Sequence, residues 1–137
     1  MINRHPSLKE PPHEPLLPLA RLMIASIKYT DNIKPPFSEV VFAWFIKIKL
    51  SKKGDEPLLA HAMYHVASFW RDPLGLIWYK TSKKYRLNEE VGAYKAQLAC
   101  YHPSKQEAQA WIYAGFLSTR YGLNISREEA LRLLRKN

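Results

Sequence analysis

The sequence lacks several features that would assign it to a well-marked class of proteins. Its single cysteine, Cys100, excludes a disulfide within the chain and favours a reducing compartment. No apolar run approaches the roughly 18 residues of a membrane-spanning helix. The start of the chain has no uninterrupted apolar segment of the kind found in secretory signals. We therefore expect a cytoplasmic protein without a membrane span.

Acidic residues are also scarce, with 12 Asp and Glu against 21 Lys and Arg, which gives a formal net charge of +9. Such a balance can favour nucleic acids, anionic membranes or acidic partners. The basic residues are scattered along the chain, however, and form no known nucleic-acid-binding motif. We expect a solvated basic surface and no specific binding of nucleic acid.

Length and composition predict one folded domain preceded by an arm. The chain has 137 residues, of which 47% are hydrophobic and 24% charged, enough for one core but not for two. Prolines crowd the start, and each fixes φ and removes an amide donor. The predicted organisation is a proline-rich N-terminal arm over residues 1–15 and a single domain over residues 16–137.

Periodicity and capping residues predict an α+β fold that is mostly helical. An apolar spacing of three and four residues predicts a helix at 16–29, and the β-branched, alternating segment 37–51 predicts one or two strands. Segment 74–87 fits a strand or an irregular loop. Further helices are expected at 56–70 after Asp55, from Asn88 to the stop at Pro103, from Ser104 to Gly122, and after Ser126.

The stretch "LAHAMYHVA" places His61 and His65 four residues apart within the predicted helix 56–70. Residues at this spacing share one helix face, so both imidazoles can reach a common metal ion. The spacing alone is weak, because two histidines on a helix are often ordinary core residues. The residues around and between the pair are uncharged, which indicates a buried helix on which two histidines need partners.

A third metal ligand is available downstream, in "NEEVGAY", where Glu90 follows His65 by 25 positions. A carboxylate from a second helix packed on the first would complete a site of two histidines and one glutamate. Such a set leaves a fourth position open on a catalytic zinc ion. Gly92, which is costly inside a helix, is consistent with a close crossing of the two helices.

These two segments resemble the signature of gluzincin zinc metallopeptidases, HExxH on one helix and ExxA on a second. The matching residues are "HAMYH" at 61–65 and "EVGA" at 90–93, within a similarity that spans about residues 37–101. The resemblance implies a small zincin-like domain with a short β-sheet or hairpin beside the active-site helix. It implies Zn²⁺ bound by His61, His65 and Glu90, with Glu89 as the alternative third ligand. A peptide or protein substrate would lie along the strand near 42–50.

The chain departs from the gluzincin pattern at two positions. Tyr94 stands where the family often has an aspartate that orients a ligating histidine. Ala62 occupies the position of the glutamate that acts as general base, which is the catalytic position of this site. General-base catalysis typically contributes about 100- to 10,000-fold, so the chain should bind zinc but hydrolyse peptides poorly or not at all.

Three interpretations remain open for a chain with this alanine. A metallopeptidase in which the glutamate was deliberately replaced by Ala62 would be inert, and we favour this one because alanine preserves helix propensity and prevents self-digestion. A natural pseudopeptidase would use zinc in a noncatalytic interaction domain. A basic nucleic-acid-binding module would use the histidines only for packing.

The oxyanion-stabilising residue of such an enzyme is not identifiable from the sequence. Tyr79, Tyr85 and His102 are candidates only through their proximity to the site along the chain, and packing roles are expected for them. The other aromatic residues are expected in the core rather than in a base-stacking platform, as is Cys100. These aromatic residues are Trp70, Trp78, Trp111, Tyr113 and Phe116.

Overall fold

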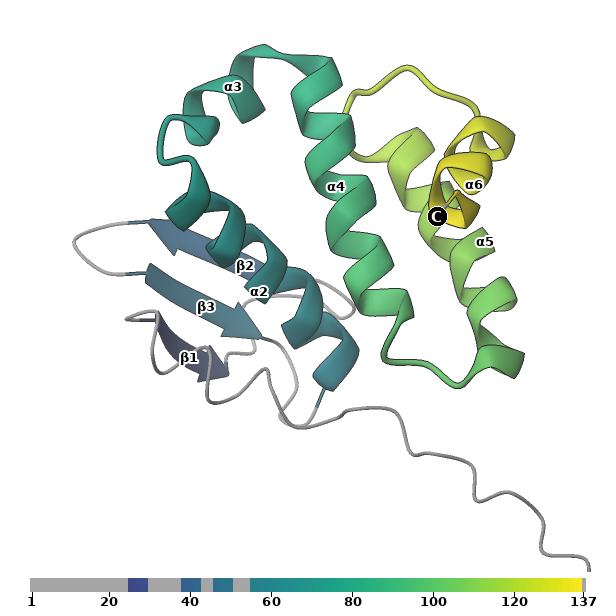
Figure 1. The fold of residues 1–137 in the computed structure, drawn as a ribbon, viewed down its shortest axis with the longest axis horizontal. Coiled ribbons are helices and arrows are strands. Elements are labelled where there is room, and N and C mark those ends of the chain that lie inside the picture. The colour runs from purple at the N-terminus through teal and green to yellow at the C-terminus, as the bar shows by residue number, and fades with distance from the viewer. Residues whose placement is uncertain (1–24, 30–37, 43–45, 51–54, 137) are drawn as a thin grey trace, which may run out of the picture.

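The computed structural model describes the backbone of residues 25–29, 38–42 and 46–50 and the whole of residues 55–136. Figure 1 shows α2 lying against the strands, α4 crossing beside it, and α5 and α6 packed on the far side of α4. The helices of residues 55–136 are α2 (Glu56–Arg71), α3 (Gly75–Thr81), α4 (Lys83–Leu98), α5 (Pro103–Thr119) and α6 (Arg127–Arg135). None of the described helices is long and apolar enough to cross a membrane.

The predicted α+β class, with a zincin-like domain, is wrong for the continuous range 55–136. This range is 79% helical and contains no strand, so it is all-α. Its main core is built by α4, α5 and α6, which pack helix on helix without the support of a sheet. The segment 74–87, for which a strand or loop was expected, forms α3 and the beginning of α4.

Ahead of this range the backbone forms three short strands, β1 (Ala25–Tyr29), β2 (Ser38–Phe42) and β3 (Ile46–Leu50). β2 and β3 lie where one or two strands were predicted. β1 lies inside the predicted helix 16–29, so that prediction is wrong for residues 25–29, where pairing with β3 overrides the helical spacing. The proline-rich arm 1–15 and residues 16–24 lie outside the described residues.

The observed strand order determines which residues of this sheet a peptide could pair with, and they differ from those expected from the sequence. The order is β1-β3-β2, with β1 parallel and β2 antiparallel to β3. Because β3 is paired on both sides, a peptide cannot add to residues 46–50, as the expected substrate position near 42–50 would require. The edges of this three-stranded sheet belong to β1 and β2, and β2 packs against α2.

The start of α2 agrees with the sequence prediction. The Asp55 side chain accepts a hydrogen bond from the Leu58 amide at 3.1 Å, and Pro57 lies in the first turn, where it has no helical hydrogen bond to lose. Most residues of α2 are apolar and are buried or half-buried. The buried residues of α2 are Leu58, Leu59, Ala60, His61, Ala62, Met63, Val66 and Ser68.

α4 begins earlier than predicted. Ser82 is its N-cap and accepts a hydrogen bond from the Tyr85 amide at 3.2 Å. Asn88, the predicted cap, lies inside the helix, and Glu90 is two turns from the N-terminus instead of in the first turn. The carboxylate of Glu90 is therefore carried by the interior of a helix rather than by its end.

The caps of the last two helices agree only in part with the prediction. α5 begins at Pro103 with His102 as its N-cap, so the predicted cap Ser104 is wrong. Proline fits this first helical position, which explains why it opens α5 instead of only stopping the preceding helix. Ser126 caps α6 as predicted, accepting a hydrogen bond from the Glu129 amide at 3.1 Å.

The core prediction holds for some of the aromatic residues and not for others. Tyr113 is buried and Phe116 packs against the core, as expected. Trp70, Trp78 and Trp111 are about half exposed, so their placement in the core is wrong. Their hydrophobicity predicted burial, but the helices that carry them turn these side chains to the surface.

The crossing of α2 and α4 is close at Gly92. A Cβ atom added to this glycine would collide with the phenol ring and hydroxyl of Tyr64 from α2. The two helices thus approach closely at Gly92, as the sequence suggested, and the contact is made by the Tyr64 side chain, which lies over the backbone of Gly92. This packing fixes the distance between the helix with the histidines and the helix with Glu90.

Replacing Gly92 by alanine tests this contact. Alanine favours a helix by about 1 kcal/mol over glycine, but beside Tyr64 we expect Gly92→Ala to lower the free energy of unfolding by about 1 to 3 kcal/mol through overpacking. In a Tyr64→Ala background the same change should be neutral or stabilising. Urea unfolding of the four proteins of this double-mutant cycle gives the coupling, and additive effects would contradict the proposed contact.

Candidate metal centre

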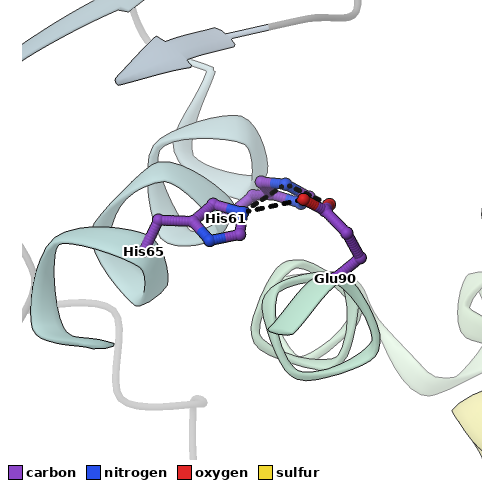
Figure 2. A group of neighbouring side chains, drawn as sticks. All are labelled: His61, His65 and Glu90. Atoms are coloured by element: carbon purple, nitrogen blue, oxygen red, sulfur yellow. Dashed lines mark hydrogen bonds and ion pairs between the residues drawn. The ribbon is translucent and has the colours of Figure 1, made fainter. Parts of the chain in front are cut away.

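His61 and His65 on α2 point toward Glu90 on α4, as Figure 2 shows. One potential ligand atom from each of the three residues lies within 4.8 Å of the others. The structure therefore brings together the three residues that the sequence suggested as metal ligands. The alternative ligand Glu89 is half-buried on α4 and does not join this group.

The distances within the cluster suit a small divalent ion. The two Nε2 atoms of His61 and His65 are 3.3 Å apart; that of His61 lies 3.5 Å from Oε2 of Glu90, and that of His65 lies 3.5 Å from the other oxygen, Oε1. In a tetrahedral site with metal–ligand bonds of about 2.0 to 2.1 Å, ligand atoms are separated by about 3.3 to 3.4 Å. The cluster could therefore hold a metal ion, but it is not specific to zinc, because this donor set also suits other first-row divalent metals.

Gln97 fixes the protonation of His61. Its carbonyl oxygen Oε1 lies 3.1 Å from Nδ1 of His61, and because a carbonyl can only accept, Nδ1 donates the proton. In the neutral ring Nε2 then carries a lone pair, and this atom faces Glu90 and His65. An outer partner of this kind orients a metal-ligating histidine in many metalloproteins.

Glu90 presents an oxygen that has no hydrogen bond. Its Oε2 atom is buried, receives no hydrogen bond from the part of the chain that the structure describes, and lies 3.5 Å from the lone-pair nitrogen Nε2 of His61. A buried carboxylate oxygen opposite a ring nitrogen without a proton is unfavourable unless a positive charge lies between them. The residues present therefore fit a bound cation.

The pKa shifts favour the forms of His61 and Glu90 that bind metals. Burial lowers the pKa of His61 and outweighs the opposite effect of the nearby Glu90 carboxylate, so the ring stays neutral. Burial alone would raise the pKa of Glu90, but the close contacts with His61 and His65 outweigh it and hold this pKa well below its usual range. A neutral imidazole and an ionised carboxylate are the species that coordinate metal ions.

Tyr79 on α3 holds the other oxygen of Glu90. Its hydroxyl donates a hydrogen bond to Glu90 Oε1. Burial and the nearby negative charge of Glu90 raise the pKa of Tyr79, so the phenol keeps its proton and remains a donor. The sequence suggested Tyr79 only as a candidate oxyanion helper, whereas the structure shows it bonded to the carboxylate.

Tyr94 and Gln97 on α4 both contact His61. The Tyr94 ring packs edge-on against the His61 ring at 4.5 Å, and its hydroxyl lies 2.7 Å from that of Tyr121. The polar support of His61 comes instead from Gln97, which sequence reasoning missed. A signal existed, because Gln97 follows Glu90 by seven residues and so lies on the same buried face of α4.

The other sequence candidates lie apart from the three ligands. The Tyr85 hydroxyl lies beside Gly75, and His102 bonds to Ser104 at the start of α5. Ala62 on α2 has 0% exposed surface, so a glutamate at this position would be enclosed by the surrounding side chains. Among the ligands, the His65 side chain is the most open at 19%, against 10% for His61 and 3% for Glu90.

No protein-family model, curated protein or solved structure matches this chain in the comparisons with known proteins.

Zinc content tests the three ligands directly. We expect about one zinc ion per chain after dialysis against zinc-containing buffer, and a loss of bound zinc in His61→Ala, His65→Ala and Glu90→Gln, because each removes one of three protein ligands. His102→Ala, which removes an exposed histidine outside the cluster, should keep the metal. Elemental analysis measures the content, and zinc retention in His61→Ala equal to that of the parent would contradict the assignment.

Two substitutions test the residues that orient the ligands. Tyr79→Phe and Gln97→Leu are each expected to weaken zinc binding by about 10- to 100-fold, because outer hydrogen bonds fix the geometry of metal ligands. Tyr85→Phe removes a hydroxyl that does not bond Glu90 and should leave the affinity unchanged. Competition with a chromophoric chelator gives the affinities, and equal values for Tyr79→Phe and Tyr85→Phe would exclude a role for Tyr79.

Proposed function

We propose that this chain is a zinc-binding domain of metallopeptidase type, in which His61, His65 and Glu90 hold Zn²⁺ and position 62 is that of the missing general base. The observation that carries the proposal is the buried Glu90 Oε2 atom, which receives no hydrogen bond from the described residues and lies 3.5 Å from Nε2 of His61. The described residues contribute three ligands, which leaves one tetrahedral position for a water molecule or a substrate carbonyl.

Each residue around the site has a separate task in this proposal. Zinc bound there would supply Lewis-acid catalysis for the hydrolysis of a peptide bond. Gln97 keeps the His61 lone pair directed at the site, and Tyr79 holds the carboxylate of Glu90 in one orientation. Ala62 offers no atom that could accept a proton, so the parent enzyme would have glutamate here, and this chain would bind metal with little or no hydrolysis.

A peptide substrate would pair with an edge of the sheet rather than with its centre. β2 is an edge strand and lies against α2, the helix with both histidines. An extended peptide that adds to such an edge gains backbone hydrogen bonds. We therefore propose that the substrate pairs with the outer edge of β2, residues 38–42.

A noncatalytic zinc site is the second candidate function, and one observation favours it. The side chains of the three ligands are only 3% to 19% exposed, and Ala62 has no exposed surface. Closed surroundings are typical of structural zinc sites, although these usually have four protein ligands. In this case the domain would hold a partner protein without cleaving it.

Restoring a base at position 62 separates the two functions. We expect Ala62→Glu to hydrolyse peptides about 100- to 10,000-fold faster than the parent chain, because glutamate can take the proton from the attacking water. Ala62→Gln has nearly the same size but no basic carboxylate and is the matched control. Mass spectrometry of a peptide library and of the protein itself detects cleavage.

Zinc content and melting temperature of both variants must be measured beside their activity, because Ala62 is fully buried. If Ala62→Glu is folded and binds zinc but cleaves no faster than Ala62→Gln, the peptidase proposal fails. That result would leave the noncatalytic zinc domain as the function that the site supports.

A further inference from the structure

The outer face of α3 exposes three large apolar side chains. Leu74 is 64% exposed, Ile77 57% and Trp78 52%. Their spacing of three and four residues places them on one side of this short helical segment. Isolated exposed apolar residues are common on proteins, but three that share one face are typical of a surface that binds something.

The inner side of α3 is fixed to the rest of the protein, so the exposure is not that of a frayed segment. Tyr79 bonds to the buried Glu90, and Gly75 lies against the Tyr85 phenol. The guanidinium group of Arg86 donates hydrogen bonds to the carbonyl oxygens of Tyr79 at 2.9 Å and Lys80 at 3.1 Å. These bonds satisfy carbonyl groups that the end of a helix would otherwise leave open.

Exposed lysines follow these apolar side chains closely along the chain. Lys80, Lys83 and Lys84 are exposed and follow Trp78 within six residues. Between residues 70 and 88 the only acidic residue is Asp72. Arg86 donates to carbonyl groups and Arg71 to the Ser68 hydroxyl, whereas the three lysines are exposed and form no ion pair with another described residue.

An anionic lipid surface matches this combination of side chains. Tryptophan and aliphatic residues insert at the boundary between headgroups and acyl chains, while lysines reach the phosphates. A nucleic acid would match the lysines and could stack on Trp78, but it offers no apolar surface to Leu74 and Ile77. α3 also lies at one end of the helical part, at the top edge of Figure 1, where a flat surface could reach it.

We propose that this face of α3 docks the protein on anionic phospholipid membranes. The docking surface consists of Leu74, Ile77, Trp78 and Lys80 at α3, together with Lys83 and Lys84 in the first turn of α4. The binding is peripheral: the three apolar side chains enter the interfacial layer, and the lysines lie at the level of the phosphates. The proposal is independent of the metal site and of hydrolysis.

Flotation of the full-length chain with vesicles tests the proposal. We expect binding to phosphatidylcholine vesicles that contain 30% phosphatidylglycerol, weak binding to pure phosphatidylcholine, and a strong reduction of binding at 0.5 M NaCl. Lys83→Gln with Lys84→Gln should lower the partition coefficient by about 25-fold, since each lysine near an anionic surface contributes about fivefold. Ile77→Ser should lower it by about tenfold through lost apolar burial.

Matched controls lie on α5, where Ile112 is 44% exposed and Lys105 is an exposed lysine. Ile112→Ser and Lys105→Gln should bind vesicles as the parent does, and melting temperatures should show that all variants are folded. Equal binding to neutral and anionic vesicles, or equal losses in the α5 variants, would overturn the proposal.

Two further outcomes would overturn it in favour of another partner. Binding to duplex DNA or RNA that depends on Lys83 and Lys84 but not on Ile77, with no vesicle binding, would identify a nucleic-acid surface. A dimer in sedimentation that Ile77→Ser dissociates, again without vesicle binding, would identify a contact between two copies of the chain.

Discussion

The arrangement of α2, α3 and α4 depends on one buried carboxylate. Placing an ionised side chain in a protein interior costs several kcal/mol unless hydrogen bonds and opposite charges compensate for it. Tyr79 on α3 donates a hydrogen bond to Glu90 Oε1 and the histidines of α2 lie 3.5 Å from the carboxylate, while no described residue donates a hydrogen bond to Oε2. Three helices thus converge on a carboxylate of which one oxygen receives no hydrogen bond from the described residues.

The sequence alone predicted those parts of the site that depend on helix capping and on the spacing of residues along a helix. Asp55 and Pro57 define the start of α2, and the spacing of His61 and His65 follows from helix geometry once that helix exists. The two histidines therefore had to share a face. Their meeting with Glu90 required only that a second helix cross α2 with the carboxylate inward.

The parts that could not be predicted depend on contacts between distant residues. Ser82 and Asn88 are both good N-caps, and the choice between them is made by α3, whose Tyr79 and Lys80 carbonyl groups bind Arg86 in the first turn of α4. The bond from His61 to Gln97 likewise depends on the separation of α2 and α4, which the Gly92–Tyr64 contact sets. Segment 74–87 is short and carries no periodic signal strong enough to separate a strand from a helix, so the fold class was wrong where tertiary contacts decided it.

The position of Glu90 within α4 has a consequence for the energetics of the whole helical part. α4 carries the carboxylate and also contributes Tyr94 and Leu98 to the core shared with α5 and α6. A ligand that binds only the folded arrangement stabilises it by mass action, in proportion to the logarithm of its free concentration. A bound metal ion would therefore make the free energy of unfolding of the core of α4, α5 and α6 depend on the concentration of free divalent ions, although the ion does not contact that core.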